Sequence, residues 1–262
     1  MEFIPEWVLN LFVLTLGLVV GSFTNVLVAR MPRGISISHP PSRCPLCLTA
    51  VRWRDNVPVL SYLLLRGRCR GCKAPISIRY PLIEVLSALL YLALKLRFGL
   101  SWLLLARYFP FATLCLTITF IDLEHRIIPD KLSLPGIVLG LATSWWVADL
   151  GFLHAALGAA AGFGGFYLVA VLYEKYSGKS GLGGGDVKLL AMMGAFLGPW
   201  GVLATVLISS VVGSVIGVGW ALATRQRNIM SSAIPYGPFL VIGGLYYSLL
   251  GETLWRLFMI PT

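Results

Sequence analysis

Long apolar segments dominate this chain and restrict what it can fold into. A helix needs roughly 20 apolar residues to cross a bilayer, with a range of about 17–25. Mean hydropathy is +0.82 and only 12% of the 262 residues are charged, about half the share found in soluble domains. We therefore expect an all-α polytopic membrane protein. The expected spans are Trp7–Ala29, Pro81–Leu96, Ser101–Ile121, Leu134–Ala148, Phe152–Tyr173, Val187–Pro199, Gly201–Ala223 and Tyr236–Phe258.

The count of about eight transmembrane helices depends on one boundary. The segment Val187–Pro199 is short for a full crossing. Only Gly198-Pro199-Trp200-Gly201 separates it from the segment that follows. Seven spans are therefore the alternative count.

Basic residues gather between the first two expected spans. Ten Arg and Lys residues lie between positions 30 and 79, and Asp55 is the only acidic residue among them. By the positive-inside rule we expect this loop to be cytoplasmic, together with the later loop that carries Arg126 and Lys131. Nucleic-acid binding is an alternative interpretation of such charge. Attraction to membrane lipid explains it better, because the charges lie next to membrane spans, so we expect lipid and no nucleic acid as a partner.

Two Cys-x-x-Cys pairs lie in the same basic loop. Cys44 and Cys47 form the first pair, Cys69 and Cys72 form the second, and 21 residues separate the two. Two such turns can supply four thiolates to a tetrahedral structural zinc site, for which separations of about 15–20 residues are typical. Disulfides and a redox pair are the alternatives, and a cytoplasmic location disfavours stable disulfides. We expect zinc to hold together a small loop domain over residues 30–80.

Two aspartates stand at the margins of apolar segments, where a charge is costly to keep. Asp122 follows the third expected span and Asp186 precedes the sixth. An even number of spans lies between them, so both carboxyl groups return to the same side of the membrane. Two carboxyl groups that meet share a proton near neutral pH, so one can activate water while the other protonates a carbonyl oxygen. We therefore expect this pair to hydrolyse a peptide bond.

A glycine-rich run, which comprises Gly181, Gly183, Gly184 and Gly185, comes directly before the second aspartate. Glycines admit backbone torsions that are closed to other residues, and they let a substrate strand approach closely. We expect Gly183 and Gly185 to contact the substrate. A flexible loop is the alternative interpretation.

Other catalytic motifs find less support. The sequence contains no G-x-S-x-G, no H-E-x-x-H and no P-loop. Glu124 and Asp130 lie near Asp122 in sequence, and we interpret both as solvated loop charges, with capping of the fourth span as an alternative for Asp130.

Five motifs in order resemble the bacterial prepilin peptidases, the leader peptidase/N-methyltransferases of type IV pilus and type II secretion systems. These belong with the GxGD intramembrane aspartic proteases, and the resemblance covers nearly the whole chain. The motifs are Gly21-Ser22-Phe23-Thr24-Asn25-Val26 with Arg30-Met31-Pro32, the two cysteine pairs, Arg79-Tyr80-Pro81-Leu82-Ile83-Glu84, the run from Ile121-Asp122 to Ile128-Pro129-Asp130, and Gly183-Gly184-Gly185-Asp186-Val187-Lys188. Two departures stand out: Thr24 replaces a more usual apolar residue, and Leu48 follows Cys47 where glycine is common.

The resemblance implies two reactions. The first is cleavage of the short basic leader of a prepilin or pseudopilin, after its glycine, on the cytoplasmic side of the bacterial inner membrane by Asp122 and Asp186. The second is N-methylation of the new N-terminal residue from S-adenosylmethionine. Glu84 is a candidate for contacting the basic leader or the new α-amino group, and a salt bridge to Arg79 or Lys188 is the alternative.

The resemblance also implies a division of the chain. Residues 1–29 form the first transmembrane helix, residues 30–80 the methyltransferase-associated zinc loop, and residues 81–262 the transmembrane protease core. A membrane transporter or an assembly scaffold with a structural zinc loop is the alternative function, because transporters also carry intramembrane acids.

Overall fold

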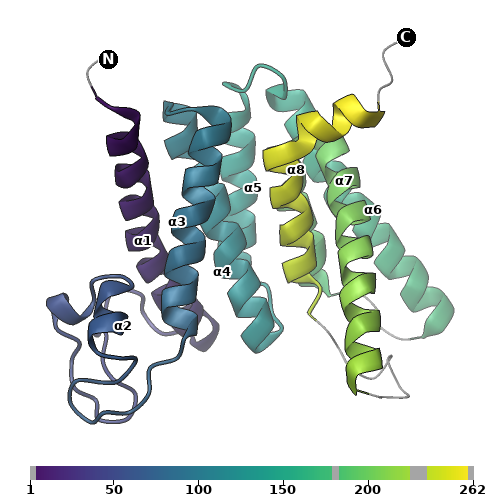
Figure 1. Cartoon of the computed structure of the whole chain (residues 1–262). Coiled ribbons are helices and arrows are strands. Elements are labelled where there is room, and N and C mark those ends of the chain that lie inside the picture. The colour runs from purple at the N-terminus through teal and green to yellow at the C-terminus, as the bar shows by residue number, and fades with distance from the viewer. Residues whose placement is uncertain (1–3, 179–182, 225–234, 259–262) are drawn as a thin grey trace. The chain divides into compact units, whose positions relative to one another are not determined.

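The computed structural model describes residues 4–178, 183–224 and 235–258 (Figure 1). Helices provide the regular structure of these residues, and the only β pairings among them are two isolated bridges in the basic loop. The chain divides into two compact units, Met1–Thr117 and Ile118–Thr262. The expected all-α class is confirmed.

The first unit is built on two antiparallel helices, α1 (Glu6–Arg30) and α3 (Arg79–Phe98) (Figure 1). The helix α1 gives way to a 3-10 turn, η1 (Met31–Arg33), because Pro32 has no N–H with which to continue the helix. The two helices touch through their backbones. A Cβ atom added at Gly17 would lie 2.5 Å from Ala88 Cα, and this close approach is typical of helix packing in membranes.

The connection between α1 and α3 carries two further short elements, η2 (Trp53–Asp55) and α2 (Leu60–Leu64). After α3 the chain forms a π-helical turn, η3 (Leu104–Tyr108), and then α4 (Phe109–His125), whose last residues belong to the second unit.

The second unit contains α5 (Asp130–Ser144), α6 (Gly151–Ser177), α7 (Gly184–Thr224) and α8 (Gly237–Phe258). Helix α7 is central, since α5, α6 and α8 all pack against it. The contact with α6 depends on small residues. A Cβ atom at Gly158 would lie 2.3 Å from the carbonyl oxygen of Gly194, and one at Gly162 would lie 2.4 Å from that of Leu190.

The expected sixth and seventh spans lie within the single element α7. The predicted boundary is present as a break, because Gly198 has φ 72° and ψ −178° and Pro199 follows it, but the chain stays helical on both sides. Within the described residues, four segments are long and apolar enough to cross a membrane: Glu6–Arg33, Leu104–His125, Gly151–Ser177 and Gly184–Trp220. The membrane class is therefore supported, whereas a count of eight spans is not confirmed.

Candidate active site and metal centre

The two aspartates of the predicted pair come together in the second unit. Asp122 lies near the end of α4, Asp186 lies in the first turn of α7, and the charge of Asp122 acts on Asp186. The Asp122 side chain is only 5% exposed, and Asp186 is half-buried. Two carboxyl groups that are shielded from bulk water and close to each other can take up and release protons in turn, as hydrolysis requires.

Backbone groups orient both carboxylates. The N–H of Gly237, at the start of α8, donates to Asp122 Oδ2 over 3.0 Å. The Asp186 carboxylate hydrogen-bonds the backbone of Gly183, and Asp186 N donates to the Gly183 carbonyl oxygen over 3.0 Å. Gly237 is a site residue that the sequence did not reveal. The available signal was Tyr236-Gly237-Pro238 at the start of the last apolar segment.

Glycines leave room for the groups around the pair. A Cβ atom at Gly185 would lie 2.9 Å from Ile128 Cβ, and one at Gly237 would lie 2.7 Å from Asp122 Oδ2 and 3.3 Å from Ile128 Cδ1. Ile128 therefore packs between the two glycines. The contact with Ile128 alone explains why position 185 is a glycine. Contact of Gly183 and Gly185 with the substrate stays a prediction. Gly181 lies outside the described residues.

An ion pair ties α7 to α5 next to this site. Lys188 Nζ donates to both carboxylate oxygens of Asp130, at 2.7 and 2.8 Å. Asp130 is the first residue of α5, so the pair fixes the first turn of α7 against the first turn of α5. Asp130 is thus an ion-pair partner and not just a solvated loop charge. Glu124 is exposed, as expected of a solvated charge, but it lies in the last turn of α4 and not in a loop.

The four loop cysteines gather into one cluster in the first unit. Their sulfur atoms all lie within 4.8 Å of one another, with 3.8 Å between Cys44 and Cys72 and 3.9 Å between Cys47 and Cys69. All four are free thiols, so they are not paired as disulfides. Tetrahedral coordination with metal–sulfur bonds of about 2.3 Å puts sulfur atoms roughly 3.8 Å apart. The cluster therefore fits a metal ion with four thiolate ligands.

Local hydrogen bonds favour the thiolate form at two of the four cysteines, Cys47 and Cys69. The side chain and the backbone of Thr49 both hydrogen-bond Cys47 and lower its pKa to about 6. Backbone hydrogen bonds from Cys72 and Gly71 lower the pKa of Cys69. A backbone hydrogen bond with Ala74 lowers the pKa of Cys72, but burial and the three neighbouring cysteines outweigh it and raise that pKa to about 11. Deprotonated sulfur is the form that binds a metal.

The two cysteine turns share one backbone geometry. Cys44 N donates to the Thr49 carbonyl and Cys69 N to the Ala74 carbonyl, at 3.0 and 2.8 Å. The residue after the second cysteine of each turn has a left-handed conformation, with φ 58° at Leu48 and φ 60° at Lys73. This conformation favours glycine, which explains why a leucine after Cys47 is a notable departure.

Glu84 lies buried in α3 and contacts the basic loop. Its Oε2 atom accepts a hydrogen bond from Val59 N over 2.8 Å, and its carboxylate also hydrogen-bonds the Ser22 side chain. Val59 immediately precedes α2 and has φ 60°. Glu84 therefore joins the helix pair to the loop, and its predicted contact with substrate stays a prediction.

Two known protein-family models match this chain. The model of the bacterial peptidase A24 N-terminal domain matches residues 15–98, and that of the type IV leader peptidase family matches residues 109–218. This chain belongs to the type IV leader peptidase family. The predicted family is confirmed. The leader peptidase match contains both aspartates, and the N-terminal match contains the cysteine cluster and Glu84. Gly237 lies beyond both.

Similar proteins carry the name prepilin leader peptidase/N-methyltransferase. One from Myxococcus xanthus strain DK1622 is 42% identical over 217 residues, which cover 83% of this chain and 64% of that protein. Those from Pseudomonas putida and Neisseria gonorrhoeae are 38% and 35% identical, and each match covers 92% of this chain and 90% of the relative. The chain thus spans just under two thirds of the first relative and nine tenths of the other two. No solved structure matches the chain.

Proposed function

We propose that this chain removes the basic leader from type IV prepilins or type II secretion pseudopilins and then methylates the new N-terminal residue. The observation that carries the proposal is the meeting of Asp122 and Asp186, which are 64 positions apart in sequence. Membership of the type IV leader peptidase family supports it, and the names of the relatives combine both activities. This membership favours a peptidase over a transporter or an assembly scaffold.

The chemistry follows from two carboxyl groups that share one proton. One carboxylate takes a proton from water while the water oxygen attacks the scissile carbonyl carbon, and the protonated carboxyl group gives its proton to the carbonyl oxygen. When the tetrahedral intermediate collapses, the carboxyl group that took the proton from water gives it to the amide nitrogen, the other carboxylate takes the proton of a hydroxyl group of the intermediate, and the C–N bond breaks. The pair then holds one proton again. The backbone N–H groups keep the carboxylates in position throughout.

The substrate reaches this pair from the lipid. A prepilin carries a basic leader followed by an apolar helix, and that helix can lie in the bilayer beside the spans of the enzyme. The scissile bond then stands at the level of Asp122 and Asp186, next to Gly183 and Gly185. We place these residues and the basic loop on the cytoplasmic side of the bacterial inner membrane, because basic loops stay on that side.

The metal site and the methylation belong to the first unit in this proposal. Cys44, Cys47, Cys69 and Cys72 hold zinc, which is structural because four thiolates leave no position for water. S-adenosylmethionine supplies the methyl group, a step supported by the names of the relatives. Glu84 is the candidate for binding the basic leader or the new α-amino group, since it is a buried carboxylate in contact with the loop.

The test is cleavage by variants of the purified protein in detergent. Asp122→Asn and Asp186→Asn should each abolish leader removal, because one carboxyl group cannot act as base and acid in the same step. Glu124→Gln is the matched control, since this exposed carboxylate lies in the same helix as Asp122. The mass of the product reports leader loss. Cleavage near the wild-type rate by either aspartate variant would refute the aspartic mechanism.

A further inference from the structure

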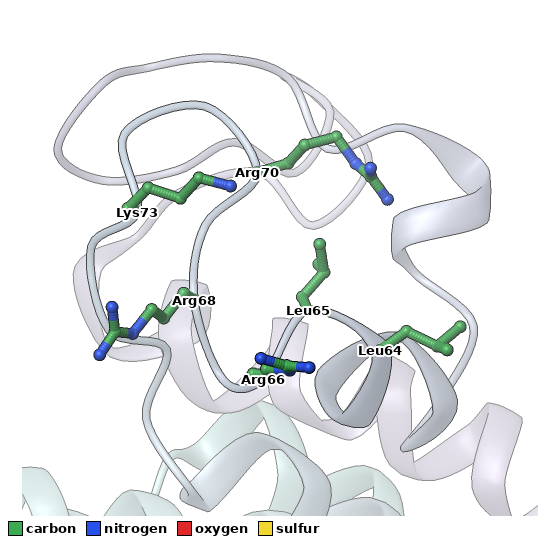
Figure 2. Close-up of a pocket in the computed structure, with 6 residues that line it drawn as sticks. All are labelled: Leu64, Leu65, Arg66, Arg68, Arg70 and Lys73. Carbon is green, nitrogen blue, oxygen red and sulfur yellow. The ribbon is translucent and has the colours of Figure 1, made fainter.

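A pocket of about 610 Å³ opens in the basic loop next to the second cysteine pair. Its lining combines the end of α2 with the turn around Cys69 and Cys72. The lining residues are Leu64, Leu65, Arg66, Arg68, Arg70 and Lys73 (Figure 2). Figure 2 shows the four cationic side chains spread around Leu65. The volume is in the range of pockets that hold small ligands, about 300–1,000 Å³.

Three of the four cations are not neutralised. The single Nε–H of Arg70 is shared between both oxygens of the Asp55 carboxylate and Nη2 donates to Oδ1, and these bonds hold the pKa of Asp55 below its ordinary value. Arg66, Arg68 and Lys73 are exposed and form no ion pair with another residue in the part of the chain that the structure describes. The pocket therefore has a surplus of positive charge, which favours the binding of an anionic ligand.

Neither ligand of the proposed function suits this pocket. The leader of a prepilin is basic, and S-adenosylmethionine has a net positive charge because its sulfonium and ammonium groups outnumber its one carboxylate. This step rests on the proposed function. Both molecules would meet repulsion from Arg66, Arg68 and Lys73, so the occupant is a third molecule with a negative charge.

Exposed apolar side chains lie beside the pocket. Leu60, Leu63 and Leu64 of α2 are 58%, 63% and 83% exposed, and their spacing places them on one face of the helical turn. Trp53 in η2 is 84% exposed. Leucine and tryptophan interleaved with arginine are typical of segments that lie in the interface of a bilayer.

The loop is tethered where such an interface would be. It leaves α1 after Arg30 and returns into α3 at Arg79, so both of its ends join one end of an antiparallel helix pair (Figure 1). Since α1 is long and apolar enough to span a bilayer, the loop lies next to a membrane surface. We propose that the pocket binds the phosphate head group of an anionic phospholipid, while the leucines of α2 lie against its acyl chains. The bound lipid holds the metal-binding loop against the membrane.

The cations can also balance the negative charge of the cysteine cluster. Four thiolates around one divalent ion have a net charge of about −2. Ten cationic side chains between residues 30 and 79, less Asp55, leave nine positive charges, and the metal cluster would reduce these to seven. Charge balance in the cluster therefore leaves most of the positive charge of the loop uncompensated, and even two charges taken from the pocket would leave one of its three unpaired cations.

The test measures lipid bound to the full-length protein. Protein in a neutral detergent is mixed with phosphatidylglycerol or with phosphatidylcholine of the same acyl chains, and native mass spectrometry gives the bound fraction. We expect tighter binding of phosphatidylglycerol. Each basic side chain near an anionic surface contributes roughly a fivefold factor, so Arg66→Gln with Arg68→Gln should weaken it by about 25-fold. Arg52→Gln with Arg54→Gln removes the same charge from the same loop outside the pocket and should change binding little.

Three results would overturn the proposal. The first is equal binding of the two lipids. The second is an equal loss in the Arg52 and Arg54 control, which would indicate diffuse attraction to the loop. The third is displacement of phosphatidylglycerol by free sn-glycerol 3-phosphate at the same concentration, which would make the ligand a soluble phosphate. Metal content and melting temperature check the fold. If the double variant loses metal, Lys73→Gln alone replaces it, with an expected loss of about fivefold. None of these readouts depends on cleavage or methylation, so failure here is distinct from failure of the proposed function.

Discussion

Gly237→Ala tests whether the position of the Asp122 carboxylate limits cleavage. The new Cβ atom would lie 2.7 Å from Asp122 Oδ2 and 3.2 Å from its Cγ atom. Ordinary contacts of a Cβ atom begin at 3.4 Å, so the carboxylate must retreat by roughly 0.7 Å. Misplacement of a catalytic group by 1 Å can cost about 100-fold in rate, so we expect kcat to fall by about 10- to 30-fold.

The same substitution should leave the fold intact. Gly237 is the first residue of α8 and has no positive φ, so its backbone accepts alanine. Alanine favours a helix over glycine by up to about 1 kcal/mol, which offsets part of the cost of the displaced carboxylate. The melting temperature should therefore stay close to that of the wild type, while kcat falls and KM changes little.

The assay follows leader removal from a purified prepilin by product mass over a range of substrate concentrations. Gly164→Ala in α6 is the matched control, because a Cβ atom there would have no neighbour within 4 Å. Methylation of a pilin that has already been cleaved should be unchanged in both variants. A Gly237→Ala protein with wild-type kcat would show that the contact with Asp122 does not position the carboxylate for catalysis.

Three further predictions concern the first unit and its independence from the aspartate pair. The purified protein should contain about one zinc ion per chain, and Cys44→Ser should release the zinc and speed proteolysis between Arg30 and Tyr80. This prediction would be contradicted if protein purified without chelator contained no metal and had all four thiols free. A cysteine variant that remains folded should still cleave prepilin but should methylate the product poorly. Asp186→Asn should instead still methylate a pilin that is supplied already cleaved. Loss of both activities together in every variant would rule out two separate sites. Glu84→Gln keeps an oxygen that can accept the hydrogen bond from Val59 N–H but removes the negative charge. The KM of the methylation reaction should therefore rise about tenfold, while the melting temperature should not change. An unchanged KM would show that the role of Glu84 is structural.

The elements of this fold were predictable where the signal is local. Continuous apolar sequence predicted a first span at Trp7–Ala29, and α1 covers Glu6–Arg30. The last span was expected at Tyr236–Phe258, and α8 covers Gly237–Phe258. The boundary at Gly198 was predicted too, and the backbone there is not helical, so two helices meet at a kink within α7. The direction of each part depends on its packing against neighbouring helices, which local sequence does not encode.

The site was predictable to the extent that the end of a membrane span fixes on which side of the membrane a carboxylate lies. Parity of crossings placed Asp122 and Asp186 on one side, and the structure brings them together. The groups that orient them depend on contacts far apart in sequence. Gly237 is 115 positions from Asp122, and Lys188 is 58 positions from Asp130. No periodicity or spacing encodes such contacts, because they arise only when helices pack.

In the first cysteine turn, a bound metal would offset the cost of a residue that local rules disfavour. Both turns place a residue other than glycine in the left-handed region, Leu48 and Lys73, and such a conformation costs roughly 1–2 kcal/mol per residue. Structural zinc contributes about 10–16 kcal/mol to the folding of small zinc-binding peptides. Two strained residues therefore consume only a small part of the free energy that a metal supplies. The leucine after Cys47 weakens the loop without preventing the site, since the sulfur atoms keep the spacing that a tetrahedral ion needs.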